Sequence, residues 1–463
     1  MRRLLLLSLV IAGLIWSALV DDLVKEGVAL RDAGDLNGAI AKLEQALRSK
    51  AKHPLANFEI GKTYLEKGEC ENAVVYLRKA QNYGYDALKN HLALGQAFEA
   101  CGNSVEAAIE YGEAAKLAPN DPACRCCLAR VSQQMSVAEA EYLNALKIDP
   151  NYVPAMVGLA NLYANSKDSL KAMTYFDKAR AAKPDYPPTY YGLGNFNMQH
   201  KKYAKGIEAF GKYIQLEPRQ PRGYTARAEV YSKIKKDTLA IKDVRQAIGL
   251  GDTTLGSLKF LAFLYGRTNQ PKERGDVLRQ VVAKDPYDTQ SWLDLARAYA
   301  KSDSARGAAD AYLKLTALDS NYVREIAPDL AMTYYTLTKY DSAAVWFKKR
   351  LEYDTLTVAT YVNLALCYLQ LKNYKAAVEN FKKALKLNPK YVKGHLWLGQ
   401  TYEFLGSKAE AMAEYKTVIK LAPNSADAKL AGEGRKRLNK PATPTTPNYQ
   451  DYWDKYWDDL YKK

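Results

Sequence analysis

A period of 34 residues constrains this chain more than any other feature of its sequence. Between residues 358 and 423, each member of one residue set is matched by a residue 34 positions later, as Tyr361 is by His395. The first set is Tyr361, Leu364, Ala365, Tyr368, Ala377, Phe381, Ala384 and Pro389, and the second is His395, Leu398, Gly399, Tyr402, Ala411, Tyr415, Val418 and Pro423. Spacings of three and four residues place the apolar members on one face of each of two helices, and the proline ends the second helix. Because one such pair cannot bury its apolar face alone, the pattern predicts a stack of helical hairpins.

The order of residue types in these sets resembles the tetratricopeptide repeat family. Variants of the pattern recur through most of the chain. The resemblance implies an all-α, right-handed superhelix of about twelve repeats over residues 20–425, closed by a capping helix over residues 426–438. Three repeats are irregular: the turn of the fourth is three residues short, the eighth has Arg274 where alanine is expected, and the tenth has one extra residue before Leu330.

An apolar run opens the chain. Two arginines follow Met1, and the residues from Leu4 to Val20 carry no charge before Asp21 and Asp22. This arrangement is typical of an export segment, so residues 1–19 are predicted to be a signal sequence or an uncleaved membrane anchor. Either outcome places the repeats outside the cytoplasm, in the periplasm or anchored facing it, as in a bacterial envelope protein.

The family resemblance implies that repeat positions 2, 5, 9, 12 and 13 line a concave groove. In repeats five and six these positions include Asn161, Asn165, Tyr191, Asn195 and Gln199. The side-chain amides of the asparagines and the glutamine both donate and accept hydrogen bonds, so they suit a peptide backbone. In repeats seven to nine they include Arg222, Lys233, Lys259, Arg267, Arg297 and Lys301, with Glu229 as the acidic exception. With a formal net charge of +16, the chain is predicted to bind an extended protein or peptide segment of acidic character. The alternative is a solvated polar face without a ligand.

Two short segments follow the predicted cap. Residues 439–448 are rich in proline and threonine and are predicted to be a linker. Residues 449–463 form an aromatic tail, with apolar residues at helical spacing at Tyr449, Tyr452, Trp453, Tyr456, Trp457 and Leu460. Such a tail can dock on a partner protein, on the basic groove of the same chain, or on the last repeat as a cap. It can also join copies, which makes a self-associating structural protein the alternative function.

Three cysteines cluster in repeat four, at Cys124, Cys126 and Cys127, and His91 lies on the first helix of a neighbouring repeat. Their spacing is not that of a zinc site, so we predict small buried thiols and no metal. A disulfide that joins one of them to Cys70 or Cys101 is the alternative in an oxidising compartment.

Catalytic signatures are missing from the sequence. It contains no phosphate-binding loop, no G-x-G-x-x-G and no H-E-x-x-H, and its four histidines lie in different repeats. We therefore expect neither enzymatic activity nor a cofactor. Nucleic acid is disfavoured as a partner despite the pI of about 9.2, because the export segment and the use of the aromatic residues in packing argue against it. The sequence predicts a protein-binding scaffold.

Overall fold

The computed structural model describes residues 18–439, and all regular structure within that range is helical. It divides into two compact units at Lys236 and Asp237. Residues 1–17 of the predicted export segment (1–19), nearly all of the linker and the whole aromatic tail lie outside the described residues, so the predictions made for them stay predictions.

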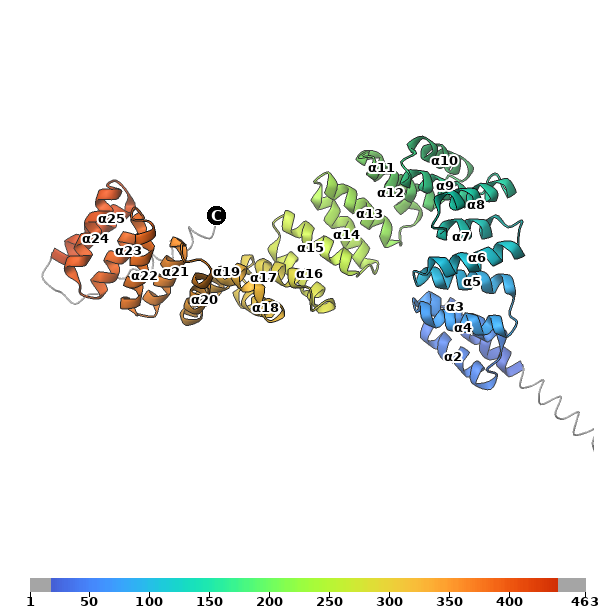
Figure 1. Cartoon of the computed structure of the whole chain (residues 1–463), viewed down its shortest axis with the longest axis horizontal. Helices are drawn as coiled ribbons and strands as arrows, with labels where there is room; N and C mark the ends of the chain where they lie inside the picture. Colours follow the sequence, from blue (N-terminus) through green and yellow to red (C-terminus); the bar gives the residue numbers. More distant parts are fainter. Residues whose placement is uncertain (1–17, 440–463) are drawn as a thin grey trace, which may run out of the picture. The chain divides into compact units, whose positions relative to one another are not determined.

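The first unit is a succession of helical hairpins (Figure 1). A helix over residues 18–32 pairs with α2 (Leu36–Ser49), and α13 (Pro221–Lys233) ends the unit. The hairpins between them are α3 (Pro54–Lys67) with α4 (Cys70–Asn82), α5 (Ala87–Ala100) with α6 (Ser104–Leu117), α7 (Pro122–Val131) with α8 (Met135–Ile148), α9 (Val153–Asn165) with α10 (Ser169–Ala182), and α11 (Pro187–Gln199) with α12 (Tyr203–Leu216).

The second unit continues the same succession from α14 (Asp237–Gly249). Its hairpins are α15 (Leu255–Arg267) with α16 (Pro271–Lys284), α17 (Thr289–Lys301) with α18 (Ala305–Leu318), α19 (Val323–Thr336) with α20 (Tyr340–Tyr353), α21 (Val358–Gln370) with α22 (Tyr374–Leu387), and α23 (Val392–Phe404) with α24 (Lys408–Leu421). The last helix, α25 (Ala426–Asn439), packs against α23 and α24. The predictions of an all-α fold with about twelve helical repeats and a capping helix are confirmed.

One large side chain from the second helix of each repeat fills the core of that repeat. These residues recur every 34 positions except across the irregular repeats four and ten, and all are buried: Leu43, Leu77, Tyr111, Tyr142, Phe176, Phe210, Val244, Leu278, Tyr312, Phe347, Phe381 and Tyr415. Each removes enough apolar surface from water to stabilise the fold by about 2 kcal/mol. The first helix approaches closely at this point: a Cβ on Gly194 would lie 2.5 Å from the Phe210 ring.

The turn between the two helices of most repeats contains one residue in the left-handed backbone region. It is glycine at Gly34, Gly68, Gly102 and Gly406, and another residue at Lys167, Lys201, Lys235, Asn269, Asp303, Thr338 and Lys372. The interval is 34 residues except across repeats four and ten, where the sequence is irregular. This conformation lets the chain end one helix and reverse within three residues.

The irregular repeats absorb their differences locally. In repeat four the turn was expected to be short, but the three missing residues are taken from the helix, since α7 has 10 residues whereas α9 and α11 have 13. In repeat ten a 3-10 turn, η1 (Ser320–Tyr322), precedes α19. In repeat eight the side chain of Arg274 lies against Gly266 and forms an ion pair of 3.1 Å with Asp294 of the next repeat.

Candidate partner-binding face

The first helices of successive repeats lie next to one another in the first unit. Helix α9 packs against both α7 and α11, and α11 also packs against α13. We call the side of the first helices that carries repeat positions 2, 5, 9, 12 and 13 the inner face, with Val358 counted as position 1 of its repeat. On α9, α11 and α13 this face carries all seven predicted groove residues of the first unit: Asn161, Asn165, Tyr191, Asn195, Gln199, Arg222 and Lys233.

The amide-bearing half of this face is accessible. Asn161, Asn165 and Gln199 are exposed, and Asn195 is half-buried. The Asn161 amide reaches the backbone of the next first helix, because a Cβ at Gly192 would lie 2.7 Å from Asn161 Oδ1. The structure therefore brings these four side chains together on two neighbouring helices, where their donors and acceptors can meet the backbone of a bound segment.

Arg222 is held between two tyrosine rings. The centre of its guanidinium lies 5.0 Å from the centroid of the Tyr191 ring and 5.2 Å from that of Tyr213, and its Nε donates a hydrogen bond to the Tyr213 hydroxyl. The Tyr191 ring in turn makes an edge contact with Tyr213, with the centroids 5.3 Å apart. Arg222 is exposed and forms no ion pair with any residue between 18 and 236. A fixed guanidinium without a carboxylate partner can form a bidentate ion pair with a carboxylate of a ligand.

Sequence reasoning missed Tyr213, which lies on the second helix α12 and counts as a core residue in the repeat pattern. Its ring is buried, but its hydroxyl positions Arg222. A tyrosine nine residues before a position-2 arginine was the only signal that the sequence offered.

Three of the four basic residues predicted for the groove of the second unit form ion pairs with carboxylates of the same unit. Lys259 Nζ lies 2.6 Å from Asp288 Oδ2, and Arg267 lies 3.1 Å from Asp237. Arg297 lies 2.7 Å from Glu325 and 3.8 Å from Asp329. Of the four basic residues predicted here, only Lys301 forms no ion pair with another described residue of the unit.

The surroundings of two of these carboxylates shift their pKa values in opposite directions. Burial pushes the pKa of Asp288 up, but hydrogen bonds from Lys259 and Ser291 outweigh burial and hold it below its usual value. Burial raises the pKa of Asp329, and the nearby Arg297 only partly opposes the rise. The repeat pattern identifies these basic positions but not their carboxylate partners, so the free positive charge of this half is smaller than the sequence predicts.

The cysteine cluster is a set of buried or partly buried thiols on α7. Burial raises the pKa of Cys124 to about 11 and that of Cys126 to about 12, which keeps both thiols protonated. The disulfide of the described chain joins Cys70 to Cys101, so the alternative that linked the cluster to one of these residues is wrong. His91 instead lies 2.7 Å from Glu110, and no group of residues between 18 and 439 has the composition and geometry of a metal site.

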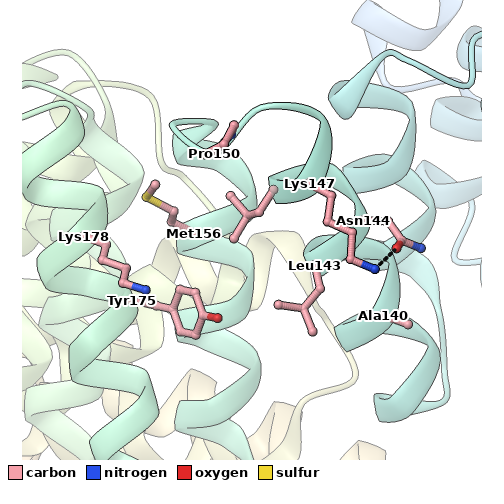
Figure 2. Close-up of a pocket in the computed structure, with 9 residues that line it drawn as sticks. Ala140, Leu143, Asn144, Lys147, Pro150, Met156, Tyr175 and Lys178 are labelled. Carbon is pink, nitrogen blue, oxygen red and sulfur yellow. Dashed lines mark hydrogen bonds between the residues drawn. The ribbon is translucent and has the colours of Figure 1, made fainter.

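A hollow on the first unit lies between α8, α9 and α10 (Figure 2). Its lining is mostly apolar, with Leu143, Met156 and Tyr175 and two lysines. Lys147 donates to Asn144 over 3.4 Å, and Lys178 lies over the Tyr175 ring at 5.0 Å. Both lysines are engaged by their neighbours, and we assign no ligand to this hollow.

Comparisons with known proteins find the tetratricopeptide repeat at both ends of the described chain. Family models described as tetratricopeptide repeat match residues 24–87, 60–122, 358–391 and 392–425. A region of 171 residues is 28% identical to the cellulose synthase operon protein C of Xanthomonas axonopodis pv. citri; it makes up 35% of this chain but 11% of that protein.

Two solved structures are similar to parts of this chain at low sequence identity. A tetratricopeptide repeat protein from Parabacteroides merdae is 17% identical, covers 53% of this chain and 98% of its own, and has a TM-score of 0.46. YrrB, described as a TPR protein with an unusual peptide-binding site, is 19% identical, covers 38% of this chain and 96% of its own, and has a TM-score of 0.33.

None of the helices between residues 18 and 439 combines the length and the hydrophobicity that a membrane crossing demands. The predicted membrane segment lies almost entirely before this range.

Proposed function

Because the chain is a tetratricopeptide repeat protein, we propose that it is a non-catalytic scaffold that binds an extended segment of a protein partner on its inner face. Tetratricopeptide arrays bind protein or peptide partners, and the proposal assigns that role to α9, α11 and α13. The observation that carries it is the guanidinium of Arg222, which two tyrosines hold in place beside four accessible amides.

The chemistry of the face suggests how a segment is held. Asn161, Asn195 and Gln199 pair with the backbone of the bound segment, which gives affinity without strong sequence selection. Arg222 takes a carboxylate of the partner in a bidentate pair, and this contact supplies the preference for acidic character. Lys233 adds positive charge at the end of α13. The partner's acidic group therefore belongs in the first unit, because three of the four basic residues predicted for the groove of the second unit already have carboxylate partners.

The proposed location is the cell envelope, outside the cytoplasm. Two features support it: the apolar segment that opens the sequence and the pairing of Cys70 with Cys101, since disulfides persist in oxidising compartments.

The binding proposal can be tested with the full chain and a library of random unstructured peptides. Peptides selected on the natural protein are measured against Arg222→Ala and against the double variant Asn195→Ala/Gln199→Ala. Loss of a charge-assisted hydrogen-bonded pair costs about 1.5–3 kcal/mol, so the Arg222 variant should bind at least about tenfold more weakly. Calorimetric titration gives the affinity.

The matched control is Lys212→Ala, which removes an exposed positive charge from the second helix α12. It should leave the affinity unchanged. If the selected peptides bind the Arg222 and amide variants as tightly as the natural protein, the inner face of the first unit is not the binding site.

A further inference from the structure

The inner face of the second unit changes character along its length. Position 9 of successive repeats is Phe263, Arg297, Met332, Leu366 and Gln400. Phe263 is 52% exposed, whereas Leu366 and Gln400 are each 1% exposed. The same position of the repeat is therefore open at α15 and covered at α21 and α23.

The covered part of the face is apolar. On α21 it consists of Val362, Leu366 and Leu369, whose spacings of four and three residues place them on one side of the helix. Leu396 continues this stripe on α23, and all four residues are 4% exposed or less. We call this stripe the apolar inner patch.

Among residues 18–439, helices α21 and α23 pack extensively only on their near neighbours in sequence. Helix α21 packs mainly against α20 and α22, and α23 mainly against α22, α24 and α25. The side of α23 that meets α24 is a different one, because a Cβ on Gly399 would lie 2.8 Å from the Tyr415 ring of α24.

A buried polar atom next to the patch lacks a partner. Gln400 is 1% exposed, and its Oε1 accepts no hydrogen bond from any described residue. A buried acceptor without a donor costs about 1–3 kcal/mol. The site thus calls for an occupant that is apolar and also offers N–H or O–H donors.

We propose that the occupant is the aromatic tail of the same chain, residues 449–463, docked on the apolar inner patch. The tail carries Tyr449, Tyr452, Trp453, Tyr456, Trp457 and Leu460. Tyrosine and tryptophan combine a large apolar ring with one hydrogen-bond donor, which is what the patch and Gln400 require.

The geometry of the chain favours this occupant. The described chain ends at Asn439, at the end of α25, which packs directly against α23. The linker over residues 439–448 spans about 30 Å at roughly 3 Å per residue. First helices of neighbouring repeats lie about 10 Å apart, so the tail reaches both α23 and α21.

A tether of this length also favours the same chain over a second copy. It keeps the tail at an effective concentration in the millimolar range, far above that of another molecule in dilute solution. As a consequence, the tail covers the inner face of the last two repeats, and the partner-binding face of the first unit stays accessible. This inference does not depend on the proposed partner.

Hydrogen–deuterium exchange of the full chain tests the proposal. The double variant Trp453→Ser/Trp457→Ser removes the two largest tail side chains and changes no residue between 18 and 439. Peptides from α21 and α23 should exchange at least about tenfold faster than in the natural protein, while those from α9 and α11 keep their rates.

A second variant tests the patch itself. Leu366→Asn should expose the tail to trypsin and raise its cleavage rate at least about tenfold, with the helix content of the protein checked by circular dichroism. The matched control is Leu387→Asn at the end of α22, where the side chain is 37% exposed, and it should leave tail cleavage unchanged.

Three results would overturn the proposal. Unchanged exchange of α21 and α23 in the tryptophan variant would mean that the tail does not cover them. Faster exchange confined to α24 and α25 would mean that the tail caps the last repeat instead. Protection of α21 and α23 that rises with protein concentration would mean that the tail docks on a second copy.

Discussion

At the scale of single residues, the turn between the two helices of a repeat is the clearest recurring feature. Seven residues other than glycine adopt positive φ there, between 52° and 65°. For a residue with a Cβ this conformation costs about 1–2 kcal/mol of free energy, whereas glycine adopts it without that cost. The chain uses glycine in its first three repeats and its last, and other residues in between.

The substitution Lys201→Gly is expected to stabilise the protein. Lys201 has φ of 57°, and its turn is closed by a backbone hydrogen bond from Lys202 to the Asn197 carbonyl, which glycine keeps. Relief of the backbone strain exceeds the extra chain entropy of glycine, so the free energy of unfolding should rise by about 0.5–1 kcal/mol. Urea unfolding followed by circular dichroism measures it.

The adjacent Lys202→Gly serves as the control, because Lys202 has φ of −82° and gains nothing from glycine. It should lower the stability or leave it unchanged. A loss of stability in Lys201→Gly would show that the lysine side chain contributes more than its backbone costs.

At the scale of helices, one disulfide cross-links two neighbouring repeats. Cys70 is the first residue of α4, and Cys101 directly follows α5, so the disulfide ties the second helix of repeat two to the first helix of repeat three. The pattern of repeats gives no reason for this link, since most repeats have no cysteine at either position. It adds a covalent link to an interface that also contains an ion pair of 2.9 Å between Arg78 of α4 and Glu110 of α6.

Removal of the disulfide is expected to destabilise the first unit. The bridge spans 31 residues of sequence, and closing a loop of that size constrains the unfolded chain by about 3–4 kcal/mol. The variant Cys70→Ser/Cys101→Ser should lower the denaturation midpoint, and a reductant should lower the midpoint of the natural protein similarly.

The reductant should leave the double variant unaffected, because the cysteines of α7 and Cys367 are free thiols. Mass mapping of the non-reduced natural protein should find Cys70 linked to Cys101. A bridge to Cys124, Cys126 or Cys127 would contradict both the pairing and this prediction.

At the scale of the whole molecule, cohesion is local. The helices pack chiefly on their neighbours in sequence, and the described chain forms two compact units. In such arrays the stability is a sum over repeats and their interfaces, so parts of one chain can unfold at different denaturant concentrations. The disulfide belongs to the first unit.

Two spectroscopic probes are therefore expected to report different unfolding transitions. Among residues 18–439 the tryptophans are Trp292, Trp346 and Trp397, all in the second unit, whereas circular dichroism reports both units. With Trp16, Trp453 and Trp457 changed to phenylalanine, fluorescence should show a lower guanidinium midpoint than circular dichroism. Superimposable transitions would indicate one cooperative unit.

The sequence by itself determined the repeat, and with it the helices, the buried core positions and the face that each residue occupies. It could do so because burial in a stack of hairpins requires apolar residues at a regular interval: Phe176 and Phe210 lie 34 residues apart, as do Phe347 and Phe381, and all four are buried. The same register predicted the turn at Lys372 and the extra residue of repeat ten, both of which the backbone shows.

Only the tertiary structure decided which side chains on that face are free. Lys259 and Arg297 have carboxylate partners, Arg222 is held by tyrosines, Leu366 is covered, and repeat four lost its residues from a helix and not from a turn. The physical reason is that the period describes each repeat by itself. Ion pairs, ring contacts and burial of the inner face arise between repeats, where side-chain length and helix ends set the distances.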